Sequence, residues 1–207
     1  MSANPYSVHP AIAYTQAIIS NLQLKTGRSL EEWIAQVKRK GPKGEKAIQE
    51  WLKDNGLGAT QAWIVAERAS LTDPTHAFLE DTPDGYLKVA ESYVAAMYAG
   101  KKAHLKPLYE ALLRLGLSLG NDVRACPCKT IVPLYREHVF AQIKPTTQTR
   151  IDLGLSLKDA PGKGRLISTG GLAKKDRISH RMEVKSLADI DDELKGWMAQ
   201  AYRLDGA

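Results

Sequence analysis

The spacing of apolar residues changes once along this chain of 207 residues, and that change constrains the fold more than any other feature. Up to about residue 117, apolar residues recur every three or four positions, which is the period of amphipathic helices. After Gly120-Asn121 they alternate with polar residues, which is the period of strands. Helices, then strands, then a closing helix predict an α+β fold rather than a parallel α/β array.

Residues 1–70 are predicted to form a small helical module. Its best-defined start is Ser29-Leu30-Glu31-Glu32, a capping box in which Ser29 and Glu32 satisfy each other's backbone donors. We interpret Trp33, Trp51 and Trp63 as its core. A helix-turn-helix is suggested over 44–69, but its last helix has few side chains that could read bases. The four expected helices are 10–24, 29–40, 44–55 and 60–69.

A turn-rich stretch at 71–85 is the predicted linker to an α+β domain over 86–207. That domain is expected to hold helices at 86–98, 105–117 and 187–204, packed on a mostly antiparallel sheet of about five strands. The clearest strand places Ile151, Leu153 and Leu155 on one face. The five predicted strands are 122–126, 130–136, 138–144, 149–157 and 177–185.

Two motif groups carry a resemblance to known families. The first part of the chain resembles a short helical domain of unknown function that is widespread in bacteria. The matching residues are Lys25-Thr26-Gly27-Arg28-Ser29-Leu30-Glu31-Glu32-Trp33, Glu50-Trp51-Leu52-Lys53 and Gly56-Leu57-Gly58. From about residue 86 the chain is similar to a C-terminal α+β domain, also of unknown function, that usually follows this helical domain. The matching residues are Ile151-Asp152-Leu153-Gly154-Leu155, His180-Arg181, Trp197 and Ala201-Tyr202. The resemblance implies the two-domain layout and assigns no activity.

Positive charge is concentrated in the second half of the chain. Residues 122–185 contain 13 basic and 6 acidic side chains, whereas residues 1–104 are almost balanced. A positive face of this density favours phosphates or an acidic partner. A solvated basic surface without a ligand is the alternative.

Motifs for catalysis or metal binding are weak. Cys126-Pro127-Cys128 lacks the second ligand pair of a zinc site, and the five histidines are scattered. Neither GxSxG nor a Walker loop is present. A metal-dependent nuclease site is one hypothesis for Asp152, Glu183 and Lys185, and a surface salt-bridge network is the alternative. We therefore assign no catalytic residue, metal or cofactor.

The predicted function is that of a non-enzymatic binding module with a basic face for nucleic acid or a phosphate-bearing ligand. We expect the loop 158–176 to be mobile until an anion binds, with Lys163 and Arg165 as the first contacts. The predicted anion-binding residues are Lys163, Arg165, Lys174, Lys175, Arg150 and Arg181.

Two alternatives stay open. One is a small-ligand or enzyme pocket around Arg150, Asp152, His180 and Arg181, although His180 on an apolar strand face also fits a core residue. The other is a protein-interaction adaptor built on the helical module. No apolar run of 18 residues and no signal-peptide pattern is seen, so we expect a bacterial, cytoplasmic protein that does not contact a membrane.

Overall fold

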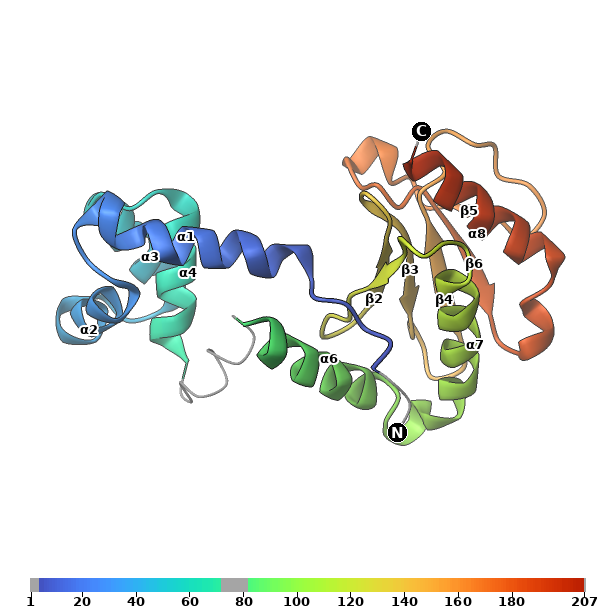
Figure 1. Cartoon of the computed structure of the whole chain (residues 1–207), viewed down its shortest axis with the longest axis horizontal. Helices are drawn as coiled ribbons and strands as arrows, with labels where there is room; N and C mark the ends of the chain where they lie inside the picture. The colour runs from blue at the N-terminus through green and yellow to red at the C-terminus, as the bar shows by residue number, and fades with distance from the viewer. Residues whose placement is uncertain (1–3, 72–81, 207) are drawn as a thin grey trace. The chain divides into compact units, whose positions relative to one another are not determined.

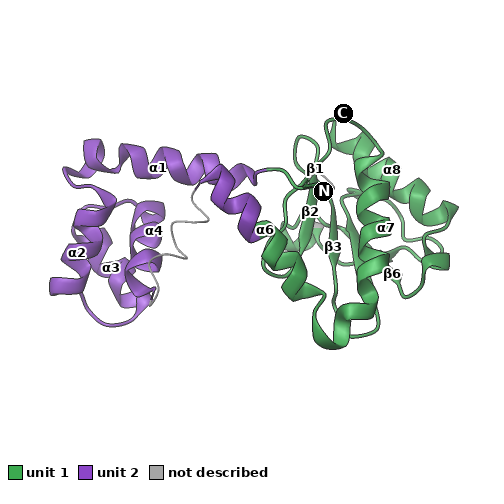
Figure 2. Cartoon of the chain, turned by 60° about the horizontal axis from the view of Figure 1, so that its bottom comes forward, with its two compact units in different colours: residues 1–7, 90–207 green, residues 8–89 purple. Residues whose placement is uncertain are grey.

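The computed structural model describes residues 4–71 and 82–206 (Figure 1). It divides the chain into two compact units (Figure 2). The helical unit contains residues 8–89, and the sheet unit contains residues 1–7 with 90–207. This division falls inside helix α6 (Pro83–Met97) rather than at the predicted residues 70 and 86. Most of the predicted linker 71–85 lies outside the described residues.

The helical unit is built from α1 (Pro10–Thr26), α2 (Leu30–Lys40), α3 (Glu45–Asp54), α4 (Ala59–Ser70) and the start of α6. The predicted capping box begins α2: Ser29 N donates to Glu32 Oε2 at 2.7 Å, and Glu32 N donates to Ser29 Oγ at 3.3 Å. Helix α4 packs against α2 and α3. The apolar core that results contains Leu22, Leu30, Trp33, Val37, Ile48, Leu52, Leu57, Ala62, Ile64, Val65 and Ala66.

The tryptophan core is confirmed only in part. Trp33 is buried at 1% exposure, and its Nε1 donates to Thr26 Oγ1 at 2.8 Å. Trp51 is half-buried, whereas Trp63 is 45% exposed. Because successive helical positions differ by about 100°, the arc of α4 that buries Ala62, Val65 and Ala66 turns Trp63 toward solvent.

The sheet unit confirms the predicted α+β class. Its six strands are β1 (Arg124–Ala125), β2 (Val132–Tyr135), β3 (Val139–Lys144), β4 (Ile151–Leu155), β5 (Ile167–Ser168) and β6 (His180–Val184). They form one antiparallel sheet in the order β1-β2-β3-β4-β6-β5. The additional strand is β5, which pairs with β6 from within the segment 158–176 that was predicted to be a loop.

Helices α7 (Lys106–Leu117) and α8 (Asp192–Asp205) pack on one face of this sheet (Figure 2). Inward-facing residues such as Leu134, Ile143 and Leu153 are fully buried there. The alternation places a polar set on the other face, where Lys144, Asp152 and Glu183 lie side by side in register. At the edge of the sheet, Tyr6 forms a parallel bridge with Ala125.

Three 3-10 helices complete the sheet unit: η1 (Gly100–Leu105), η2 (Leu172–Lys174) and η3 (Leu187–Asp189). The first of these joins α6 to α7, where the sequence predicted an interruption between two helices. Within the described part of the chain, no helix combines the length and apolar character needed to cross a membrane.

Candidate anion-binding site

Four lysines of the sheet unit line one cavity of about 510 Å³. They come from three segments that are distant in sequence. Lys101 and Lys102 belong to η1, Lys129 lies between β1 and β2, and Lys144 ends β3. Polar neighbours are Thr130, Thr146 and Gln148, and apolar neighbours are Ala96, Met97, Ala99 and Pro145. We name this site the lysine pocket.

Local backbone structure places these lysines. Gly100 has φ 55°, a left-handed conformation that turns the chain from α6 into η1. Lys102 Nζ then donates a hydrogen bond to the carbonyl oxygen of Pro145, which joins η1 to the β3–β4 connection. Lys144 is carried by β3, whose pairing with β2 and β4 fixes its position. The positions of the pocket lysines therefore depend on the sheet as well as on the connections between its strands.

The charged side chains described in the lining of the lysine pocket are all positive. Among the described residues that line the cavity, none carries a carboxylate. Among the residues that the structure describes, none of the four ammonium groups lies within 4.0 Å of a carboxylate oxygen. Like charges around one cavity repel one another. A bound anion would relieve that repulsion and accept hydrogen bonds from the ammonium groups.

Arg150 and Arg181 are placed differently, in a network of ion pairs on the open sheet face. Arg150 Nη1 lies 2.7 Å and Arg181 Nη1 lies 2.9 Å from Glu183 Oε1. Arg150 Nε is 3.0 Å and Arg181 Nη1 is 3.4 Å from Asp152 Oδ1. Both guanidinium groups therefore already contact carboxylates. Their predicted anion-binding role stays a prediction, and an incoming anion would have to compete with Asp152 and Glu183.

The same network bears on the nuclease hypothesis. Asp152 and Glu183 are directly opposite each other on β4 and β6, and Lys185 Nζ is 3.3 Å from Glu183 Oε2. The residue types are the expected ones, but Arg150 and Arg181 contact both carboxylates, where a metal ion would otherwise bind. The observed geometry is that of a salt-bridge network, which was the alternative to a nuclease site in the sequence analysis.

His180 does not join Arg150, Asp152 and Arg181. The β4–β6 pairing is regular from Ile151 to Leu155, so His180 faces the core while Arg181 faces the open side. His180 is 3% exposed, and its Nδ1 lies 2.8 Å from the Oγ of Ser179, which is also buried. The alternative of one pocket around these four residues is therefore corrected: a core histidine and an open-face cluster lie on opposite sides of the sheet.

The middle of the segment 158–176 makes contacts with the rest of the sheet unit. Leu166 is buried, and the Arg165 guanidinium contacts the carboxylates of Asp189, Asp191 and Glu193, the last at 3.3 Å. The anion-binding role predicted for Arg165 stays a prediction, and an incoming anion would have to compete with these carboxylates. Mobility of the loop before binding stays a prediction.

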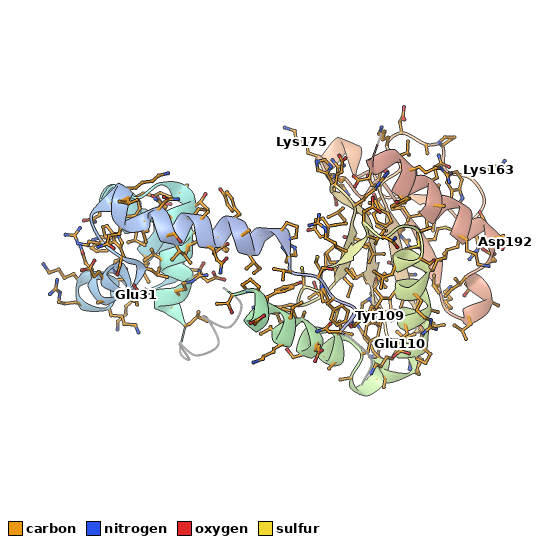
Figure 3. All side chains as sticks on the ribbon, in the orientation of Figure 1. Glu31, Tyr109, Glu110, Lys163, Lys175 and Asp192 are labelled. Carbon is orange, nitrogen blue, oxygen red and sulfur yellow. The ribbon has the colours of Figure 1, made fainter. Side chains whose placement is uncertain are left out.

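The other loop lysines lie apart from one another. Lys163 borders a different cavity, of about 620 Å³, together with Asp192 and Glu193, so its surroundings are acidic. Lys174 and Lys175 are exposed near η2. Lys163 and Lys175 project from separate parts of the sheet unit (Figure 3). The structure does not gather the predicted set into one site.

The two cysteines differ in burial: Cys126 is buried and Cys128 is half-buried. Burial raises the pKa of the Cys126 thiol to about 12, which keeps it protonated near neutral pH. Cys128 is half-buried, and its Sγ lies 3.8 Å from the carbonyl oxygen of Cys126. Over residues 4–71 and 82–206, no three His, Cys, Asp or Glu side chains are grouped so as to hold a metal ion.

Sequence reasoning missed the lysine pocket. Lys101 and Lys102 lie in the gap between the predicted helices 86–98 and 105–117, and the sequence gives no role to Lys129. The available signal was a Gly-Lys-Lys between two helices and lysines at strand ends. Their convergence depends on strand order, which periodicity does not reveal.

The fold and the site define a two-unit protein whose α+β unit carries a cationic cavity. The chain belongs to the family described as domain of unknown function DUF5655, whose model matches residues 94–205. The matched region contains all four pocket lysines. No curated protein and no solved structure matches the chain.

Proposed function

We propose that the sheet unit is a non-enzymatic binding module and that the lysine pocket takes a phosphate group of its ligand. The observation that carries this proposal is that four lysines line one cavity, whose described lining residues include no carboxylate. Elsewhere in the unit, Arg150, Arg165 and Arg181 contact acidic side chains. At the lysine pocket, positive side chains without a close carboxylate partner among the described residues are grouped around a cavity of small-ligand size.

A binding role is favoured over catalysis because the described residues of the pocket lining supply mainly hydrogen-bond donors. Its polar groups are ammonium groups, two threonine hydroxyls and one amide. General acid–base chemistry needs a group that titrates near the operating pH. The lining residues that the structure describes include no histidine and no carboxylate.

The test compares two triple variants of the full chain. The pocket variant is Lys101→Gln/Lys129→Gln/Lys144→Gln, which keeps Lys102 and its bond to Pro145. The matched control is Lys163→Gln/Lys174→Gln/Lys175→Gln, which removes the same charge elsewhere in the unit. Isothermal titration with pyrophosphate should show at least a tenfold weaker Kd for the pocket variant, about 1.4 kcal/mol. Equal losses in both variants would mean that only net charge matters.

Phosphate could come from a small molecule or from nucleic acid. A labelled single-stranded oligonucleotide, measured by fluorescence anisotropy at several salt concentrations, distinguishes the two sources. Polymer binding weakens steeply with salt because counterions are released along the backbone. If neither pyrophosphate nor the oligonucleotide binds, the proposed function is wrong.

The adaptor role of the helical unit is supported by one observation. Tyr14, Leu24 and Trp63 are 62%, 86% and 45% exposed in that unit. Light scattering of the full chain and of Leu24→Ser/Trp63→Ser would show whether these side chains mediate self-association. The bacterial origin, the cytoplasmic location and the resemblance of residues 25–58 to a bacterial helical domain stay predictions.

A further inference from the structure

We infer that the ligand of the lysine pocket is a compact organic molecule carrying two phosphate groups, such as an organic diphosphate or bisphosphate. This inference rests on the proposed function. It adds the number of phosphate groups and the presence of an organic part. Three features of the cavity carry it: its charge, its composition and its boundary.

The charge of the pocket matches two phosphates. The four ammonium groups supply four positive charges around a single cavity. One phosphate monoester carries about −1.5 to −2 at neutral pH, so one group leaves the pocket strongly positive and two roughly balance it. These lysines come from three segments of the chain, η1, the β1–β2 connection and the end of β3.

The apolar part of the pocket wall favours a ligand that has an organic part in addition to phosphate. Ala96, Met97, Ala99 and Pro145 contribute an apolar portion of the wall. Inorganic diphosphate would leave this surface in contact with water, whereas a ring or a short alkyl chain would cover it and gain the free energy of apolar burial. Thr130, Thr146 and Gln148 offer hydrogen bonds to hydroxyl or carbonyl groups of such a moiety.

The boundary of the pocket argues against a polymer. Nucleic-acid strands need a continuous basic track along which successive phosphates bind. Beyond Lys144 the open sheet face continues to Asp152 and Glu183, which lie next to it in register. These two carboxylates, contacted by Arg150 and Arg181, interrupt any basic track across the sheet. A cavity of about 510 Å³ is instead of the size that encloses a small molecule.

The experiment uses the full chain and titrates four probes: pyrophosphate, and three organic phosphates with two phosphate groups that carry a purine nucleoside, a sugar or a short alkyl chain. We expect at least one organic probe to bind tenfold or more tightly than pyrophosphate. Its binding should be lost in Lys101→Gln/Lys129→Gln/Lys144→Gln and retained in Lys163→Gln/Lys174→Gln/Lys175→Gln.

A second variant isolates the organic moiety. Ala96 is exposed on α6, where Leu has a helix propensity close to that of Ala, so Ala96→Leu should fold normally while filling the apolar side of the cavity. It should weaken the preferred organic probe about tenfold or more and change pyrophosphate binding by less than twofold. The matched control is Ala95→Leu, which is also exposed on α6 but lies outside the pocket.

Each outcome has a distinct meaning. If pyrophosphate binds at the lysines but no organic probe exceeds it, the inference is overturned while the proposed function stands. The same holds if the oligonucleotide binds more tightly than every small probe. If no probe binds at all, the proposed function fails and the inference fails with it.

Discussion

Lys102 donates a hydrogen bond from Nζ to the carbonyl oxygen of Pro145, which lies 43 residues further along the chain. This contact joins η1 to the β3–β4 connection and so connects two of the segments that form the lysine pocket. Lys102 therefore has a structural role, whereas Lys101 beside it is exposed. The two neighbours should respond differently to the same substitution.

The first prediction concerns that difference. Lys102→Met should lower the free energy of unfolding of the sheet unit by about 1 kcal/mol, because a partly exposed hydrogen bond from a charged donor is lost. Lys101→Met should leave the melting temperature nearly unchanged, since exposed charges contribute little to stability. Hydrogen exchange of residues 100–105 and 145–148 measures the effect directly. Identical exchange in both variants would contradict it.

The second prediction concerns Arg165. Its guanidinium contacts three carboxylates of η3, α8 and the turn between them. Arg165→Gln should lower stability by about 1 kcal/mol, because it leaves this group of acidic side chains without its cation. Exchange of the amides of residues 158–166 should become faster, while pyrophosphate binding stays unchanged. Lys163→Gln, two residues away and exposed, is the control and should alter neither property.

The prediction for Arg165 differs from what the sequence alone suggested, and the contact of Lys102 was not indicated by the sequence at all; both have a physical reason. Periodicity shows which face of a strand a residue occupies, and it correctly placed Ile151, Leu153 and Leu155 in the core. Local chemistry likewise predicted the Ser29–Glu32 capping box. Both signals depend only on neighbours in sequence.

Partners distant in sequence were not predictable in this way. Glu183 lies beside Asp152 because β6, and not β5, pairs with β4. Arg165 reaches Glu193 across 28 residues. The count of basic residues over 122–185 therefore indicated excess charge but not which cations are neutralised. The lysine pocket depends on the same unknown, since its lysines meet only once strand order is fixed.

The third prediction is a pH dependence. The hydrogen bond from Arg181 holds the pKa of the Glu183 carboxyl below its usual value of 4.5, with Lys185 and Arg150 adding to the effect. A carboxyl whose pKa is lowered by folding stabilises the protein above the pKa of the unfolded chain, and this contribution is lost as pH falls through the folded pKa. Glu183→Gln should therefore reduce the melting temperature at pH 7 and have progressively less effect below about pH 4.5.

Melting curves of the parent and of Glu183→Gln at pH 7, 5 and 3.5 measure this dependence. Glu110→Gln, which removes an exposed carboxyl of α7 from the same unit, is the control. A difference between the parent and Glu183→Gln that stays constant across these pH values would show that the carboxylate charge is not the stabilising feature.

The last prediction concerns Gly100, which turns the chain into the segment carrying Lys101 and Lys102. Its φ of 55° is left-handed, and a Cβ atom there would meet nothing within 4 Å, so Gly100→Ala has a conformational cost of about 1 kcal/mol and no steric one. Gly27, with φ 75° and equally open surroundings, is the matched position in the helical unit. Both substitutions to Ala should lower stability by a similar amount, but only Gly100→Ala should weaken pyrophosphate binding, because only it displaces pocket lysines. Gly100→Asn should restore much of the loss, since Asn tolerates the left-handed region. Equal binding by Gly100→Ala and Gly27→Ala would show that the η1 lysines do not contact the anion.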